Sequence, residues 1–188
     1  MHTNAPRRIL TKLVLLSVFL TCAGRGEPPV RGPLPEEQKK IIHFLAEHHD
    51  ELRRKVTLRK EGYAASTTTD NKELAAKLKE HFAYMKKRLG SGAMVRRWDP
   101  AFVELVKFHD QLTTEVEYLE DGISVVVTGK TPEAVKVARN HARIITGFTT
   151  KGAAAVRERH DAVHDGGKPS PKAGRGRGKQ PAPPAEPK

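Results

Sequence analysis

The chain has few reactive side chains apart from its histidines. Its 188 residues include one cysteine, Cys22, one tryptophan and only 5% aromatic residues. A mature protein that has lost Cys22 carries no thiol, which excludes disulfides, thiolate metal sites and cysteine nucleophiles. The nucleophile-elbow, phosphate-loop and dinucleotide-binding patterns are missing, as is a convincing pair of carboxylates. The sequence therefore gives no support for an enzyme.

Long hydrophobic runs are also missing. The opening apolar run, Leu13 to Thr21, is too short to span a membrane. Basic residues precede it and small residues follow it, which is typical of a secretory signal peptide. We predict a signal peptide over residues 1–23, a linker over 24–35 and a periplasmic or secreted protein, whose partner could then be an envelope protein. Cleavage after Ala23 would discard Cys22, and lipid anchoring through Cys22 is the alternative.

The basic charge lies mainly at the two ends of the chain. The net charge is +12, yet residues 36–165 hold 23 basic and 20 acidic residues. We therefore expect no nucleic-acid partner for the folded part, which we place in one globular domain over residues 36–165. Residues 166–188 consist mostly of Gly, Pro, Lys and Arg without apolar periodicity, and this composition predicts a disordered basic tail.

The most informative feature is an internal repeat at an offset of 60 residues without a gap. Such a repeat indicates one supersecondary unit present twice. We place repeat 1 at about residues 36–92 and repeat 2 at about 99–152, followed by a terminal helix over 153–163. The recurring residues are Leu45, His49, Asp50, Leu52, Val56, Gly62, Thr68, Glu73, His81 and Gly92, which return as Leu105, His109, Asp110, Leu112, Val116, Gly122, Thr128, Glu133, His141 and Gly152.

Each repeat is predicted to form an α-β-β-α unit. Apolar residues at helical spacing predict a helix over residues 36–52, and alternation after it predicts a hairpin that turns at Gly62. Asp70 or Asn71 can cap a second helix, which runs to about residue 89. The second repeat predicts a helix over residues 99–112, a hairpin that turns at Gly122, and a helix from Thr131 to about residue 148.

The hairpins of the two repeats carry opposite charges. Lys55 and Lys60 in the first correspond to Glu115 and Glu120 in the second. Opposite charges on neighbouring strands attract, which favours pairing of the two hairpins. The predicted fold class is therefore α+β, with both repeats in one four-stranded antiparallel sheet and the helices packed on one face.

The recurring histidines are the leading candidates for a functional site. The helical spacing places His49, His81, His109 and His141 on the apolar faces of the predicted helices. A buried imidazole needs a partner, and a metal ion supplies one. Nitrogen ligands suit Zn, Cu, Ni or Fe, and two histidines on approaching helices could bind a haem, with Met85 as a spare ligand.

Two other hypotheses remain open. In the first, the histidines only brace the core of a non-catalytic periplasmic interaction or structural module. In the second, the basic tail makes the chain a nucleic-acid- or anionic-polymer-associated protein. His160 and His164 are four residues apart, and we interpret them as a solvated helix end because no glutamate lies between them in a metalloprotease pattern.

The arrangement of these motifs resembles a group of small exported bacterial proteins of unknown function. The shared pattern is a duplicated histidine, glycine and histidine unit, formed here by His49, Gly62 and His81 and again by His109, Gly122 and His141. The segment Val95-Arg96-Arg97-Trp98-Asp99-Pro100 separates the two units. The resemblance covers about residues 40–163. It implies export and a preserved set of histidines, and it implies nothing about activity.

Overall fold

The computed structural model describes residues 32–164. The predicted signal peptide, most of the predicted linker and the predicted basic tail lie outside these residues. Repeat 1 contains helix α1 (Glu36–Glu47), the 3₁₀ helix η1 (His49–Glu51), strands β1 (Arg53–Arg59) and β2 (Gly62–Thr68), and helix α2 (Lys72–Gly90). Repeat 2 contains α3 (Pro100–Lys107), η2 (His109–Gln111), β3 (Leu112–Tyr118), β4 (Gly122–Gly129), α4 (Pro132–Lys151) and the short α5 (Ala153–Val156).

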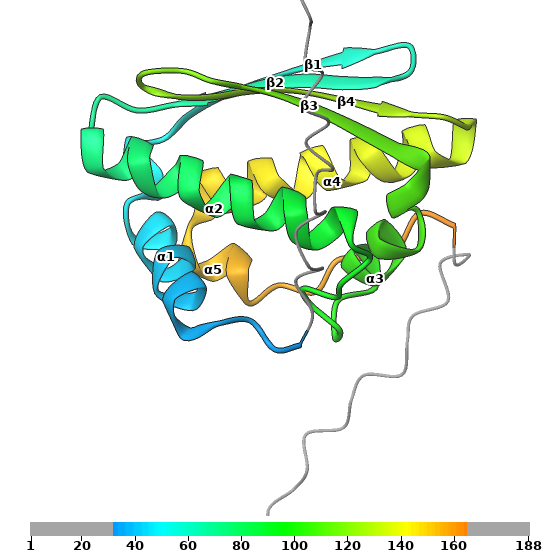
Figure 1. Cartoon of the computed structure of the whole chain (residues 1–188), viewed down its shortest axis with the longest axis horizontal. Coiled ribbons are helices and arrows are strands. Elements are labelled where there is room, and N and C mark those ends of the chain that lie inside the picture. The colour runs from blue at the N-terminus through cyan, green and yellow to red at the C-terminus, as the bar shows by residue number, and fades with distance from the viewer. Residues whose placement is uncertain (1–31, 165–188) are drawn as a thin grey trace, which may run out of the picture.

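The predicted fold class is confirmed. The strands form one antiparallel sheet in the order β1-β2-β4-β3, and the helices lie on one side of it (Figure 1). The α-β-β-α pattern occurs twice. Within the described residues, no helix is both long and apolar enough to cross a membrane.

The two repeats are related by a pseudo-two-fold axis at the junction of β2 and β4. In the register of these strands Ala65 pairs with Val125, and the two residues occupy the same position of their repeats. The axis therefore passes near this pair. As a consequence β1 and β3, which correspond to each other, lie at opposite edges of the sheet. The expectation of opposite charges on neighbouring strands is thus wrong, because two strands separate the charged edges.

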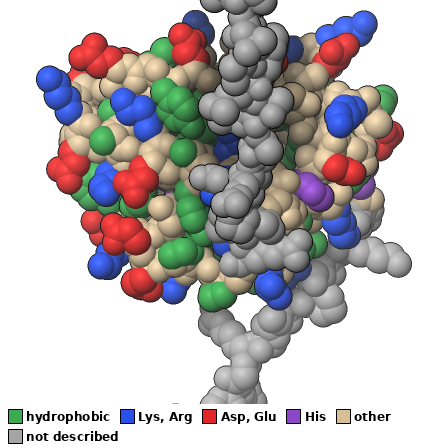
Figure 2. All heavy atoms as spheres, viewed as in Figure 1, with side chains coloured by type: hydrophobic (Ala, Val, Ile, Leu, Met, Phe, Trp, Pro, Cys, Tyr) green, Lys and Arg blue, Asp and Glu red, His purple; other side chains and the backbone are tan. Residues whose placement is uncertain are grey.

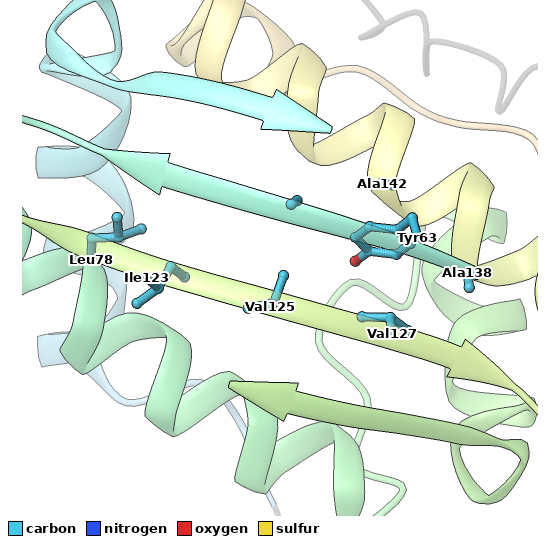
Figure 3. Close-up of a cluster of buried hydrophobic side chains, with 8 residues drawn as sticks. Tyr63, Leu78, Ile123, Val125, Val127, Ala138 and Ala142 are labelled. Carbon is cyan, nitrogen blue, oxygen red and sulfur yellow. The ribbon is translucent and has the colours of Figure 1, made fainter. Parts of the chain in front are cut away.

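The helices cross from one repeat to the other. Helix α4 of repeat 2 packs over β1 and β2 as well as over its own β4, and helix α2 of repeat 1 packs over β4. Between helices and sheet lies a core of side chains from both repeats (Figure 3): Tyr63, Ala65, Leu78, Ile123, Val125, Val127, Ala138 and Ala142. Neither repeat can bury its hairpin alone, so the duplication is needed for a stable domain.

The termini of α2, α3 and α4 follow from their capping residues. The side chain of Asn71 accepts hydrogen bonds from the first turn of α2, and Thr131 does the same for α4 at the corresponding repeat position. Asp99 caps α3 and is followed by Pro100 at its first position. These polar side chains bond backbone N–H groups that have no partner within the helix.

Several predicted boundaries are wrong. The first helix of each repeat ends early, at Glu47 and Lys107, and a 3₁₀ turn leads directly into the strand. The predicted terminal helix over residues 153–163 ends at Val156. In contrast α4 continues through Gly147 to Lys151. Leu52 and Leu112 continue the apolar spacing of the helices before them. However, Leu52 lies just before β1, Leu112 is the first residue of β3, and both pack against the core.

Candidate functional site

His49 and His109 lie in the 3₁₀ turns and not on helix faces. Nδ1 of His49 lies 3.0 Å from the carbonyl oxygen of Ala46, and Nδ1 of His109 lies 2.8 Å from that of Val106. Ala46 and Val106 are again the same repeat position. Each imidazole therefore closes the end of its first helix through a backbone oxygen.

Both of these rings also contact a glycine of the other repeat. A Cβ atom on Gly152 would lie 2.4 Å from Nδ1 of His49, and one on Gly92 would lie 3.2 Å from Nε2 of His109. Both glycines have positive φ, at +55° and +68°. Because only glycine allows the ring this close in such a conformation, the recurring histidines and glycines together join the two repeats.

His81 and His141 lie on α2 and α4 and point toward the core. Burial lowers the pKa of His81 from 6.5 to about 4. Burial also lowers the pKa of His141 to about 4, and the positive charge of Arg54 adds to that shift. Both rings are therefore neutral at pH 7. Nδ1 of His81 is buried without a hydrogen-bond partner in the described part of the chain, whereas His141 meets Phe102 edge to face.

The four histidines do not gather around one point that could hold a metal ion. Across residues 32–164 there is no group of three or more His, Cys, Asp or Glu side chains suited to that role. Met85 lies on α2, about one turn after His81. Two surface cavities of about 230 and 270 Å³ lie at the β1-β2 turn and after α2, and neither is lined by any of these five residues. Binding of a metal or haem by fewer histidines stays a prediction.

Two buried carboxylates form a cluster that the sequence analysis missed. Asp99 is 0% exposed and Glu104 is 3% exposed. Nδ1 of His160 lies 2.8 Å from Asp99, and Nδ1 of His164 lies 2.9 Å from Glu104. The expectation of a solvated helix end is therefore wrong: the segment after α5 is not helical, and its histidines bond buried acids. A glutamate among the apolar residues of α3 was the available signal.

The same cluster contains a stacked arginine. The guanidinium of Arg96 lies 4.3 Å from the ring centroid of Trp98, and 5.1 and 5.3 Å from those of Phe102 and Phe148. It also lies 3.4 Å from the carboxylate of Asp99. Aromatic faces attract a guanidinium, and the carboxylate balances its charge. The cluster thus fixes residues 158–164 against α3 and is a structural clasp.

A repeated pair of cations holds the hairpin turns. Nζ of Lys79, on α2, donates to the backbone oxygens of Leu119 and Glu120 in the β3-β4 turn. The guanidinium of Arg139, on α4, donates to those of Arg59 and Lys60 in the β1-β2 turn. Each helix therefore fixes the hairpin turn of the other repeat. Lys79 and Arg139 are also 60 residues apart, a recurrence that the sequence analysis missed.

Among the described residues, no helix covers the outer face of the sheet. Its central strands carry small side chains: Ala64, Ser66, Thr68, Ser124, Val126 and Thr128. Its edges carry exposed charged and threonine side chains, on β1 Arg53, Lys55, Thr57 and Arg59, and on β3 Thr113, Glu115 and Glu117. Figure 2 shows acidic and basic side chains along the top of the view, where Figure 1 places the sheet.

The comparisons with known proteins assign no family. No family model, no curated protein and no solved structure matches this chain. The fold and its surfaces define an α+β protein made of two crossed repeats with one open sheet face. The resemblance to small exported bacterial proteins stays a prediction.

The depressed pKa values predict a stability that falls in acid. Between pH 6.5 and about 4 the unfolded chain binds more protons at His81 and His141 than the folded chain does. The contribution of these two histidines to the free energy of unfolding is therefore complete above pH 6.5. It decreases as the pH falls toward about 4, by at most about 3 kcal/mol for each histidine.

A leucine at position 81 tests this pH dependence. His81→Leu removes the group whose protonation destabilises the native chain in acid. The free energy of unfolding of the variant minus that of the native chain should therefore be about 2 kcal/mol larger near pH 5 than near pH 8. His43→Gln, at an exposed position of α1, is the matched control and should leave the pH profile unchanged. Urea unfolding at a series of pH values measures both. A His81→Leu profile parallel to that of the native chain would contradict the assignment.

Proposed function

We propose that this protein is an interaction module that binds a partner through the open face of its sheet. The observation that carries the proposal is that helices cover one face of the sheet, whereas no helix within residues 32–164 covers the other face with its charged edges (Figure 1). The recurring histidines support it indirectly. His49 and His109 serve contacts between the repeats, so a structural role accounts for their recurrence.

The charges on this face support a binding role more than a purely solvated one. Lys55, Arg59, Glu115 and Glu117 have no ion pair within the described residues, although oppositely charged neighbours would stabilise them. Exposed charges of this kind steer a partner of opposite charge toward the face and fix its orientation. The compartment in which the partner is met depends on the export signal predicted over residues 1–23, which stays a prediction.

Photo-crosslinking from two matched alanine positions tests this function. A photoreactive phenylalanine analogue replaces Ala64 on the open face in one variant, and exposed Ala83 on α2 in the other. In cells that produce the protein, we expect an adduct of discrete mass from position 64 and none from position 83. We also expect adding Lys55→Glu to weaken the adduct, because the partner is held partly by charge.

The comparison of the adducts from positions 64 and 83 decides whether the open face is the binding surface. Equal adducts from both positions, or none from position 64, would overturn the proposal that the open face is the binding surface. An adduct from position 64 that Lys55→Glu does not change would overturn the role given to the charged edge.

A further inference from the structure

The two edges of the open face carry opposite charges. Strand β1 presents Lys55 and Arg59 outward, together with Arg53, which pairs with Asp70. Strand β3 presents Glu115 and Glu117. The pseudo-two-fold axis relates the backbones of β1 and β3 to each other, but the charges of their outward side chains have opposite signs. One edge is therefore basic and the other is acidic.

The strand register aligns these charges across the sheet. Lys55 pairs with Ser66, Ser66 pairs with Ser124, and Ser124 pairs with Glu117. These four residues form one straight row from the basic edge to the acidic edge. The next row in the same direction contains Thr57, Ala64, Val126 and Glu115. Because Thr57 is uncharged, only the first row carries opposite charges at its two ends, and a partner with the reverse order of charges would match that row.

We propose that the partner is a second copy of this chain, stacked face to face about a two-fold axis that runs parallel to the strands. The inference rests on the proposed function of the open face. Rotation about this axis places β1 of each copy over β3 of the other. Lys55 of each copy then faces Glu117 of the other, so every dimer gains this charge pair twice. A two-fold axis in the same plane but across the strands would place like charges together, which is unfavourable.

The small residues in the middle of the face allow two sheets to approach. Ser66 and Ser124 would pack against each other across the axis, flanked by Ala64 and Val126. Stacked sheets lie about 10 Å apart, and side chains of this size fit that spacing. Bulky residues occur on the opposite face of these strands, where Tyr63, Ile123 and Val127 fill the core.

The size of the face predicts a weak dimer. Four strands of about seven residues span about 23 by 19 Å at the usual strand rise and spacing. The flat area is about 400 Å² for each copy, which is below the roughly 500 Å² per partner expected of a stable interface. Because charge pairs at the edges supply much of the attraction, the dimer should dissociate at high salt.

Charge reversal tests this arrangement without removing any packing. We expect the full chain to sediment as a concentration-dependent dimer at low salt and as a monomer at high salt. Lys55→Glu and Glu117→Lys should each weaken dimerisation by about tenfold or more, because each turns both pairs of the dimer into repulsions. The double variant Lys55→Glu with Glu117→Lys should dimerise again. Lys86→Glu, exposed on α2, is the control and should not change the dimer.

An equal mixture of the two single variants is the sharpest form of the experiment. One variant carries acidic residues at both positions and the other carries lysine at both, so only the mixed pair is complementary. We expect sedimentation to show a one-to-one heterodimer. Circular dichroism verifies that each variant is folded.

Four results would overturn the proposal: a native chain that stays monomeric at low salt, single reversals that dimerise normally, a double variant that fails to recover, or species that grow beyond two copies. The last result would indicate pairing at sheet edges, which builds open chains. If crosslinks from position 64 contain a different protein, the proposed function survives and the second-copy proposal fails.

Discussion

Replacing Gly122 by alanine is expected to destabilise the protein by about 3 kcal/mol or more, one of the two largest effects of a single substitution that the structure implies. A Cβ atom on Gly122 would lie 2.1 Å from the carbonyl oxygen of Thr67, and one on Gly62 would lie 1.9 Å from that of Val127. Both oxygens belong to central strands that are paired on either side. The backbone cannot move away without breaking the junction between the repeats.

The matched control for this prediction is a glycine with free space around it. Gly147 lies inside α4, and a Cβ there would meet no atom within 4 Å. Gly147→Ala should therefore stabilise the protein by about 0.5–1 kcal/mol through helix propensity. Urea unfolding followed by circular dichroism measures both variants. If Gly122→Ala unfolds at the urea concentration of the native chain, the close approach of β2 and β4 is wrong.

Removing Glu104 is expected to cost about 3–5 kcal/mol of stability. Its carboxylate accepts hydrogen bonds at 2.8 Å from the backbone N–H groups of Val163 and His164, and lies 2.9 Å from Nδ1 of His164. Alanine at this position would leave these groups without this partner, at a carboxylate position that is only 3% exposed. Asp99→Ala should have an effect of the same size, because Asp99 holds His160 in the same way.

A local readout separates this effect from general unfolding. Loss of either carboxylate frees the segment from 158 to 164, so trypsin should cleave after Arg159 under conditions in which the native chain resists it. Asp110→Ala is the control, since its side chain is exposed and its change should stay within about 0.5 kcal/mol. If Glu104→Ala keeps both its stability and its resistance to trypsin, the clasp contributes little to the fold.

The sequence was sufficient to predict the fold class because three independent signals agreed. The 60-residue repeat, the helical and alternating patterns and the glycines at the turns all indicate the same two units. The helix boundaries could not be found in this way. Leu52 continues the spacing of α1 although it packs against the core as the first inward residue before β1. Period alone does not separate the two roles at a helix-to-strand junction.

The candidate site was harder to predict, because its contacts join residues from different repeats. The recurrence of His49 was visible in the sequence, but its contact with Gly152 depends on how α4 crosses to the first repeat. The clasp formed by Asp99 and His160 also depends on the path of the chain after α5. The opposite charges of Lys55 and Glu115 are visible in the sequence, yet only the strand order shows that they lie at opposite edges of one face.

Dimerisation through the open face is tested by a dilution series of the isotope-labelled full chain followed by two-dimensional NMR at low salt. If two copies stack through the open face, backbone amide signals will shift with concentration in β1, β2, β3 and β4, most strongly in the row that contains both Lys55 and Glu117. Signals of α2, α4 and the clasp residues Asp99 and Glu104 should stay fixed. Shifts confined to the helices or to the four recurring histidines, or no shifts at all, would contradict it.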